Sequence, residues 1–459
     1  MGSLDLLPAQ RALPWALLVA ALASGCAEPA RSVSSDFVEW AAENAIAVES
    51  LESPLPAADI ESLREVIGSA RLVGVGESRH DTHEQLLLKA LLVRHLIEDL
   101  DFRALILEES FAHVEPLDRY ITTGEGDLRE IMTSLAGWYL WDTEEMIEFV
   151  QWVRQVNEGR PPGRHVRIFG MDITAPATAV QDVLESLDVA GVKLQLAPRR
   201  LGLDLQQGDF WPGTWERYAA VSDGRRNELA GGYRDLIAVV KEERARIVAA
   251  FSEPDYERTV FLAEIGRVGN DFFSSTDREQ AGAIRESGMA MVITWIRENE
   301  VQGDKAILWA HNLHVAKSSF RMPGFVDGTL EPMGVLLSEE LGDAYMAIGG
   351  SFGTGSFPPD LPPGERRFEA VSEDVMDGAL AAVGVPFFLV DLRGAEDDPA
   401  VIEWLGQERE WLAQDSTALL VPHAAFDLVY FVKEISRSQP TPAALRRYRS
   451  LESAGAGPR

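Results

Sequence analysis

The chain has 459 residues, of which 46% are apolar and 25% are charged, as in an ordinary soluble globular protein. Its net charge of −31 excludes binding to nucleic acid through phosphate neutralisation, which needs a positive surface. A single cysteine excludes intramolecular disulfide bonds and clusters of thiolate ligands. The length suits one large domain or two smaller ones. The charge is typical of a strongly solvated surface, or of a field that attracts cationic substrates.

The first 26 residues resemble an export signal. Arg11 precedes an apolar run at 12–23 that is too short to span a bilayer, and small residues follow it. The ending LASGC resembles a bacterial lipobox, although its leucine stands one place further upstream than usual. We therefore expect residues 1–25 to be a lipoprotein-type signal peptide and Cys26 to be lipidated, with ordinary secretion as the alternative. The protein would then be exported and held at the cell envelope by a lipid anchor, with residues 26–35 as a tether.

Apolar periodicity predicts alternating helices and strands after the tether. A helix is expected from Asp36, and another at 62–70 with Ser62 as its N-terminal cap. Buried strands are expected at 71–75, 102–109, 166–172, 306–311, 385–392 and 426–432. At 342–355 a strand is expected to run into a glycine-rich loop.

Residues 174–303 carry many helical signals and few strand signals, and 278–300 read as one long helix. The pattern predicts an α/β domain at 36–436, with a central, mostly parallel β-sheet flanked by helices. The stretch at about 174–303 would be a large helical insertion that forms one wall of the active-site cleft. Residues 437–459, rich in Pro, Ala, Gly and Arg, are expected to form a flexible tail.

Ionisable side chains follow several predicted strands at the point where each strand ends. The stretch RLVGVGESRHDTHE at 71–84 follows this pattern, and AILWAHNLH at 306–314 repeats it. Because loops at the carboxyl edge of a parallel sheet form the ligand crevice, these residues are expected to share one cleft. They are Glu77, His80, Glu108, Glu109, Asp172, His311, His314 and Asp391.

For four other residues, the expected surroundings follow from the helices near them. Trp141 stands before a helix start at 142–144 and could wall a pocket, whereas Trp152 is expected in the core. His83 is expected to be a polar group near the site or at a helix start. His95 is expected on a helix surface.

A histidine beside a carboxylate can act as a general base at neutral pH, and a second histidine or an arginine can stabilise an oxyanion. The chain has no GxSxG motif and no free cysteine for a nucleophile, which favours direct attack by water without a covalent intermediate. The same residue types also permit metal binding. His311 and His314 with His80 and a glutamate could hold zinc or iron, although HExxH is absent.

Ordered segments over roughly residues 70–360 resemble the erythromycin esterase family. GVGESRHDTHE resembles its GE-x-x-H-G-T segment, and LILEE its glutamate-bearing second strand. Further segments in the same order are LDRY, WYLWDTEEMIEFVQWVRQVN, VRIFGMD, ILWAHNLHV and MGVLLSEELGDAYMAIGGSFGTGSF. Members are metal-independent hydrolases that open a macrolide lactone by water attack. The resemblance implies that His80 is the general base, and it places the family's other site residues on Glu77, Glu108, His311 and His314.

The sequence departs from the family pattern at several positions. Asp81 replaces the glycine after the base, which adds a charge that would raise the pKa of His80. Lys89 replaces the usual arginine, so a charge is kept but the bidentate fork is lost. Arg285 and Glu286 resemble the family's arginine–acid pair, but Val292 replaces its usual asparagine. The scaffold can therefore be kept while the substrate differs.

We therefore expect a hydrolase that opens a small-molecule ester or lactone, with no cofactor and no metal. His80 would be the base, with Glu77 and Glu108 orienting it or the water. The oxyanion would be stabilised by His311 and His314, with Arg285 or Lys89. Substrate contacts are expected at Trp141, Asp172 and Glu109. The alternatives are an envelope lipoprotein that binds metal or haem through His80, His311 and His314 without catalysis, and an inactive scaffold.

Overall fold

The computed structural model describes residues 33–453, apart from 54, 207–210, 302, 304 and 363. The expected signal peptide, Cys26 and the tether up to residue 32 lie outside the described residues. Helix α1 begins at Val33 rather than at Asp36, so the last residues of the expected tether are helical. Within the described part, no helix combines the length and the apolar character needed to cross a bilayer.

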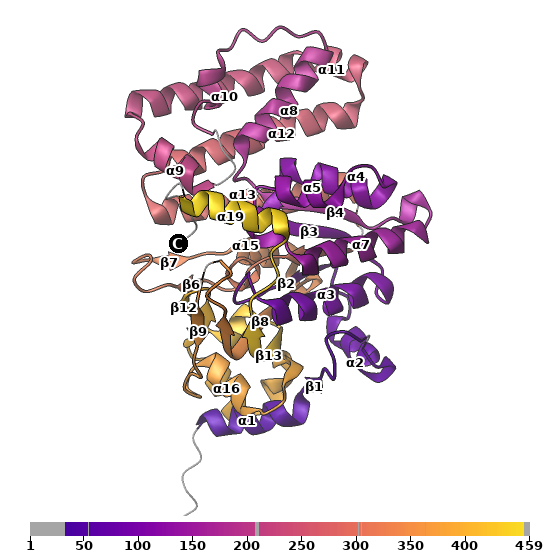
Figure 1. Cartoon of the computed structure of the whole chain (residues 1–459), viewed down its shortest axis with the longest axis vertical. Helices are drawn as coiled ribbons and strands as arrows, with labels where there is room; N and C mark the ends of the chain where they lie inside the picture. Colours follow the sequence, from indigo (N-terminus) through magenta and orange to yellow (C-terminus); the bar gives the residue numbers. More distant parts are fainter. Residues whose placement is uncertain are drawn as a thin grey trace, which may run out of the picture. The chain divides into compact units, whose positions relative to one another are not determined.

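A nine-stranded sheet forms the centre of the fold, as the sequence predicted (Figure 1). Its main path runs β1-β10-β13-β8-β2-β5-β3-β4, and the six strands from β13 to β4 are mutually parallel. Strands β1 and β10 are antiparallel at one edge, and β9 pairs antiparallel with β8. The strands are β1 (Ile46–Ala47), β2 (Leu72–Val75), β3 (Phe102–Ser110), β4 (Arg167–Asp172), β5 (Lys305–Trp309), β8 (Tyr345–Phe357), β9 (Arg366–Phe368), β10 (Phe387–Asp391) and β13 (Leu428–Ser436).

The register of the parallel strands brings their carboxyl ends level with one another. Val75, the last residue of β2, pairs with Trp309, the last residue of β5. Trp309 also pairs with Leu107 of β3. The residues that follow these positions therefore emerge at one edge of the sheet, where loops can place their side chains together.

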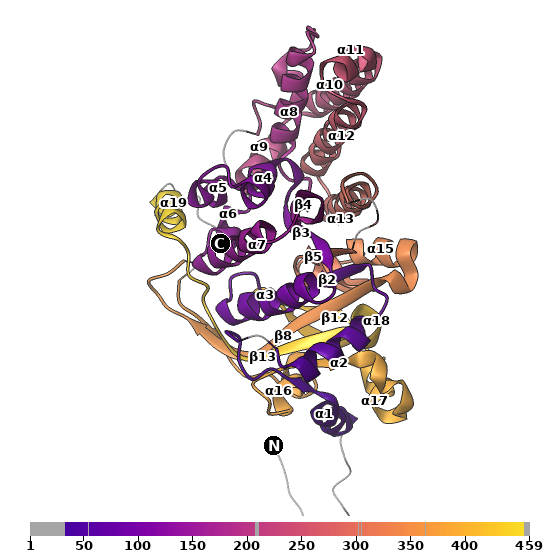
Figure 2. The ribbon, with the colours of Figure 1, turned by 90° about the vertical axis from the view of Figure 1, so that its right-hand side faces the viewer.

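Alternate residues of each central strand face opposite layers of helices, as the period of two requires. Val73, Leu105 and Ile307 pack with α3 (His83–Glu98) and α7 (Glu144–Glu158). Their neighbours Leu72, Ile106 and Leu308 pack with α13 (Arg278–Trp295) and α15 (Met333–Leu341). Figure 2 shows these two helical layers on either side of the sheet. Burial on both faces explains why the strands read as continuous apolar runs.

The expected helical insertion occupies the whole span between β4 and β5, with no strand among its described residues. It forms the upper part of Figure 1, where α12 packs against α8 and α10. Its helices are α8 (Pro176–Val189), α9 (Trp211–Ala219), α10 (Asp223–Glu242), α11 (Arg244–Ala250), α12 (Glu253–Ser274) and α13. A π-helical turn, Ile296–Glu300, ends the long helix that the sequence predicted.

A second, antiparallel sheet was not predicted from the sequence. Its order is β11-β12-β6-β7, with β11 (Arg409–Ala413), β12 (Ser416–Leu420), β6 (Phe320–Arg321) and β7 (Thr329–Leu330). Strands of two to five residues are too short for an apolar period to stand out. We call this element the small sheet.

Two local predictions differ from the structure. Ser62 lies inside α2 (Ala57–Ile67) and does not cap it, because the helix begins one and a half turns earlier. The glycine-rich stretch is not a loop but part of β8. Gly349 there packs against the Phe426 ring, where an added Cβ would lie 2.9 Å from Cγ. Glycine thus serves close packing within a strand rather than a turn.

The segment expected to be a flexible tail contains a packed helix, α19 (Pro442–Ser453). Tyr448 is 5% exposed, and its ring centroid lies 4.8 Å from that of Trp138 in α6 (Trp138–Trp141). Ala444 completes this small cluster. Composition suggested a tail, whereas the helix is docked by Tyr448 and by Arg447, which donates to the carbonyl of Thr133.

Replacing Tyr448 with alanine should release α19, because removing a buried aromatic ring costs about 3 kcal/mol. Hydrogen–deuterium exchange should then show faster exchange of amides at 442–453. Arg449→Ala, at an exposed position of the same helix, is the matched control and should exchange like the wild type. Equal exchange in all three proteins would show that Tyr448 does not anchor the helix.

Candidate active site

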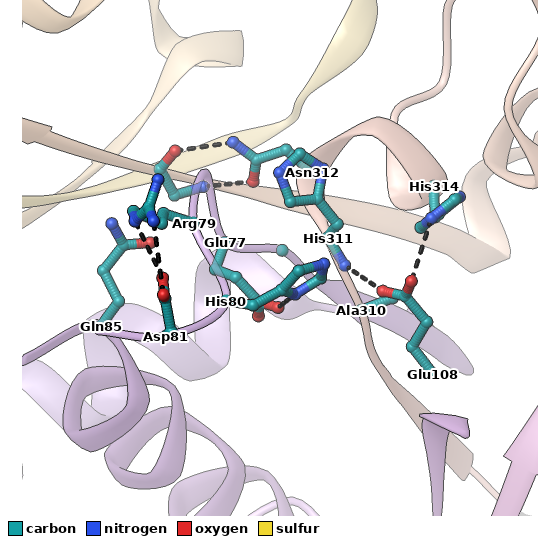
Figure 3. Close-up of polar contacts among 12 residues, drawn as sticks. Glu77, Arg79, His80, Asp81, Gln85, Glu108, Ala310, His311, Asn312 and His314 are labelled. Carbon is teal, nitrogen blue, oxygen red and sulfur yellow. Dashed lines mark hydrogen bonds and ion pairs between the residues drawn. The ribbon is translucent and has the colours of Figure 1, made fainter. Parts of the chain in front are cut away.

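Most of the strand-end residues converge on one large cavity, with a volume of about 1150 Å³. Glu77 and His80 lie in the loop after β2, Glu108 lies near the end of β3, and His311 and His314 follow β5 (Figure 3). The helical insertion contributes α13 and forms part of the cavity wall, in the position that the sequence predicted. The predicted residues that line the cavity are His80, Glu108, Glu109, Asp172, Arg285, His311 and His314.

His80 is held by a carboxylate on one side of its ring. Its Nδ1 lies 2.7 Å from Oε1 of Glu77, so the neutral ring donates from Nδ1 and keeps Nε2 as an acceptor. No partner for Nε2 is found among the described residues, and His80 lines the cavity. Burial lowers the pKa of His80 below its ordinary value, and Glu108 partly opposes this shift. An imidazole that is neutral at neutral pH is suited to accept a proton.

Lys89 lies behind the loop after β2 rather than in the cavity. Its fully buried Nζ forms an ion pair with Glu77, donates to the carbonyl of Ala310 at 3.2 Å, and lies 4.8 Å from the ring centroid of Trp309. Burial lowers the pKa of Lys89 well below its ordinary value. The ammonium group is occupied by the ion pair with Glu77 and lies outside the cavity, which does not fit the expected role of Lys89 in stabilising an oxyanion.

Glu108 connects three elements through its carboxylate. Oε2 accepts the backbone N–H of His311 at 2.9 Å, whereas Oε1 lies 3.0 Å from Arg285 Nη2 and 3.1 Å from His314 Nε2. Burial acts to raise the pKa of Glu108, but His314, His80 and Arg285 outweigh it and hold the pKa well below its ordinary value. Glu108 is thus a permanent anion that organises the cations around it.

His311 has both ring nitrogens engaged with the backbone. Its Nε2 donates to the carbonyl of Ser78 at 3.0 Å, and its Nδ1 accepts the N–H of Leu313 at 3.2 Å. Burial lowers the pKa of His311 well below its ordinary value, so the ring is neutral. His311 therefore has no free N–H for an oxyanion, which corrects the role that the sequence suggested. It serves instead to place the loop after β2.

His314 is the opposite case and carries a positive charge. Its Nδ1 lies 2.6 Å from Glu286 Oε1, and its Nε2 faces Glu108. Burial acts to lower the pKa of His314, but Glu286 and Glu108 outweigh it and raise the pKa to about 10. In the sequence, Glu286 stands out only as the neighbour of Arg285. Its position next to Arg285 in α13 was the one indication in the sequence that Glu286 could reach the site.

Arg285 reaches the cavity from the helical insertion. Its Nε and Nη2 bind Asp172 at 3.1 and 2.8 Å, and Nη2 also binds Glu108. Nη1 lies 3.3 Å from His314 Nε2, and no carboxylate accepts from it among the described residues. Burial acts to lower the pKa of Arg285, but Asp172 and Glu108 raise it well above its ordinary value. Arg285 and His314 thus form a pair of adjacent cations at the cavity.

The expected substrate contacts have different surroundings. Asp172 and Glu109 line the cavity, but their oxygens already accept hydrogen bonds: Asp172 from Arg285, and Glu109 from the backbone N–H groups of Ser110 and Gly137, each at 2.7 Å. Burial raises the pKa of Glu109 to about 8. Trp141 does not line the cavity. It is buried in the core beside Gly137, so its predicted pocket role is wrong.

Three residues singled out in the sequence lie away from the site. Asp391 ends β10, which is antiparallel to β13, so it emerges at the opposite edge of the sheet. His95 is buried rather than exposed, with Nδ1 2.8 Å from Asp99. His83 opens α3, as expected, and pairs with Glu145 at 2.6 Å.

Asn312 was not predicted to belong to the site, but its side chain holds the backbone next to it. Its amide exchanges two hydrogen bonds with the backbone of Gly350, at 2.7 and 2.8 Å, and so ties the end of β5 to β8 (Figure 3). Gly76 lies directly against the Asn312 side chain, where a Cβ would clash with Oδ1. An asparagine between two histidines gives no local sequence signal for this clamp.

The possible metal ligands are already neutralised by protein cations. Among the described residues, Glu77, His80 and Glu108 offer ligand atoms within 4.8 Å of one another. However, Glu77 is paired with Lys89, and Glu108 with Arg285 and His314. The alternative site of three histidines is not favoured, because both ring nitrogens of His311 and of His314 are engaged.

The chain is similar in sequence and fold to known proteins of one family. The family model for erythromycin esterase matches residues 97–435. Erythromycin esterase type II of Escherichia coli is 23% identical over 377 residues, which cover 74% of this chain and 85% of the relative. Type I of the same organism is 25% identical over 344 residues, covering 70% and 81%. A solved erythromycin esterase variant in its open conformation shares the fold, with a TM-score of 0.68, 21% identity, and coverage of 85% and 98%.

Replacing Glu286 with glutamine should lower the pKa of His314 from about 10, because it removes the carboxylate that raises it most. An NMR titration of the histidine ring signals would measure the shift. Glu279→Gln, on the same helix at an exposed position of the cavity wall, should leave the titration unchanged. An unchanged His314 titration in the Glu286 variant would contradict the assigned charge.

Proposed function

This chain belongs to the erythromycin esterase family, and from this premise we propose that it opens a carboxylic ester or lactone by attack of a water molecule that His80 activates. Family membership supports a hydrolase. The proposed role of His80 as the base rests on the geometry of its ring. Glu77 holds its Nδ1 at 2.7 Å and leaves Nε2 without a partner among the described residues, at the wall of the cavity.

In the proposed reaction, Nε2 of His80 takes a proton from water as the water oxygen bonds to the substrate carbonyl carbon. The carbonyl oxygen becomes an oxyanion. Collapse of the tetrahedral intermediate breaks the bond to the leaving oxygen, which takes the proton back from His80. One ester and one water thus give one acid and one alcohol, without a covalent enzyme intermediate.

Arg285 and His314 are the proposed oxyanion stabilisers. Both are cations at the cavity, and both are fixed by carboxylates before substrate arrives. Preorganised charge of this kind stabilises a developing anion without a cost of reorganisation. Glu108 supports the pair, and Lys89 supports Glu77, so both act through their neighbours.

The cavity suits a substrate with a large apolar body. Apolar side chains line the cavity beside His80: Trp215 and Phe272 from the helical insertion, Phe320 and Leu330 from the small sheet, Met322 next to it, and Leu313 after β5. Erythromycin is a reasonable first probe because the relatives bear its name. Asp81 and Lys89 differ from the family pattern, so a panel of other lactones and esters belongs beside it.

We also propose that the protein is exported and anchored through lipidated Cys26, from its sequence context alone. The anchor would hold the cavity at the cell envelope, where it would meet an incoming ester or lactone. The intact mass of the mature protein tests this proposal: acyl chains on an N-terminal cysteine support it, and an uncleaved N-terminus contradicts it.

His80→Ala should abolish hydrolysis, with a loss of at least about 100-fold, because His311 and His314, the other two histidines of the cluster, have both ring nitrogens engaged. Mass spectrometry of lactones and esters incubated with metal-stripped protein should show a gain of one water with the wild type only. His83→Ala removes a histidine that is also paired with a glutamate but lies outside the cavity, and it should stay active. Near-normal turnover by the His80 variant would refute its role.

The rate constant kcat/KM should rise with pH through an ionisation below the ordinary histidine value of 6.5, because His80 must be deprotonated and burial lowers its pKa. It should then stay level and fall near pH 10, where His314 loses its charge. Initial rates on a base-stable ester would give this profile. A rate that falls between pH 5 and 7 would contradict a neutral imidazole base.

A further inference from the structure

The turn of the small sheet touches the loop that carries His80. This turn, Gln414–Asp415, joins β11 and β12. The N–H of Gln414 donates to the carbonyl of Ser78 at 2.8 Å, and the same carbonyl accepts from His311 Nε2 at 3.0 Å. One backbone oxygen, two residues before the base, is therefore held from two separate parts of the chain.

The second contact joins the turn to the residue next to the base. Arg79 Nη1 binds Asp415 at 2.7 Å, and Arg79 Nε lies 2.8 Å from Asp81. The Arg79 side chain is only 3% exposed, with the rings of Phe357 and Phe368 at 5.0 and 4.9 Å. A buried guanidinium with two carboxylates and two aromatic faces has little freedom to move.

The strand that carries this turn is itself anchored to the central sheet. The indole N–H of Trp411 donates to the carbonyl of Gly350 in β8 at 3.1 Å. The N–H of Leu412 donates to Asp377 at 2.7 Å, and Asp377 also binds Ser351 of β8 at 2.6 Å. The turn is thus built on the same strand to which Asn312 is clamped.

The backbone of the turn is strained. Gln414 has φ of 54°, and Asp101 is the one other non-glycine residue with positive φ in the part of the chain that the structure describes. The first position of such a two-residue hairpin turn favours glycine, and a side chain there costs about 1 kcal/mol. Strain that persists next to a site indicates a constraint from that site.

We propose that Asp415 is a positioning residue for His80: by binding Arg79, it lets the turn of the small sheet fix the loop from Glu77 to Asp81 against the central sheet. Asp415 does not touch the reacting atoms in this role. The kinetic part of the inference rests on the proposed hydrolase function, whereas its structural part does not.

Asp415→Asn tests the proposal by steady-state kinetics. The carboxylate is 56% exposed, so the variant should fold. We expect kcat to fall about tenfold while KM changes by less than about twofold, because a displaced base slows chemistry more than binding. Asp415→Glu should restore most of the rate. Glu410→Gln removes an exposed carboxylate from β11, for which no contact with the loop is found, and should match the wild type.

Hydrogen–deuterium exchange of residues 77–84 supplies a readout that needs no substrate. Exchange should be faster in Asp415→Asn than in the wild type and in Glu410→Gln. Unchanged exchange overturns the inference, as does faster exchange with unchanged kcat. If the wild type hydrolyses nothing but exchange still rises in Asp415→Asn alone, the proposed function fails while the hold of Asp415 on the loop is supported.

Discussion

The site depends on one buried carboxylate, that of Glu108. Its two oxygens hold the backbone of His311, the side chain of His314 and the guanidinium of Arg285, and so join β3, the end of β5 and the helical insertion. A buried anion is stable only when it is paired and hydrogen-bonded. Arg285 and His314 must therefore lie next to Glu108. The burial of Glu108 thus accounts for the positions of Arg285 and His314, the two cations proposed to stabilise an oxyanion.

The three histidines of the cluster differ in their ionisation. The ring centroids of His80 and His311 are 5.0 Å apart, and those of His311 and His314 are 6.4 Å apart. Burial lowers the pKa of the first two, whereas two carboxylates raise the pKa of His314 to about 10. Partners, rather than residue type, decide which ring accepts a proton, which is inert and which carries charge.

The sequence predicted the parallel strands because strands buried on both faces leave continuous apolar runs, and it predicted their polar ends. It could not tell that β10 runs antiparallel, so Asp391 was grouped with a site at the opposite edge. Nor could the sequence show that Lys89 pairs with Glu77 and that His311 donates to the carbonyl of Ser78, because these contacts depend on strand register and side-chain rotamer. The small sheet escaped prediction because its strands are two to five residues long.

Helix α19, the last helix among the described residues, also contributes to the cavity, because Tyr448 lines it together with His80. The chain is synthesised from its N-terminus, so the sheet, the His80–Glu77 pair and the cation pair are all encoded before the cavity wall is complete. A protein that stops after β13 would keep these groups but lack Tyr448 in the lining of the cavity. The groups that carry the proposed chemistry thus all precede α19 along the chain, and Tyr448 adds to the cavity lining after them.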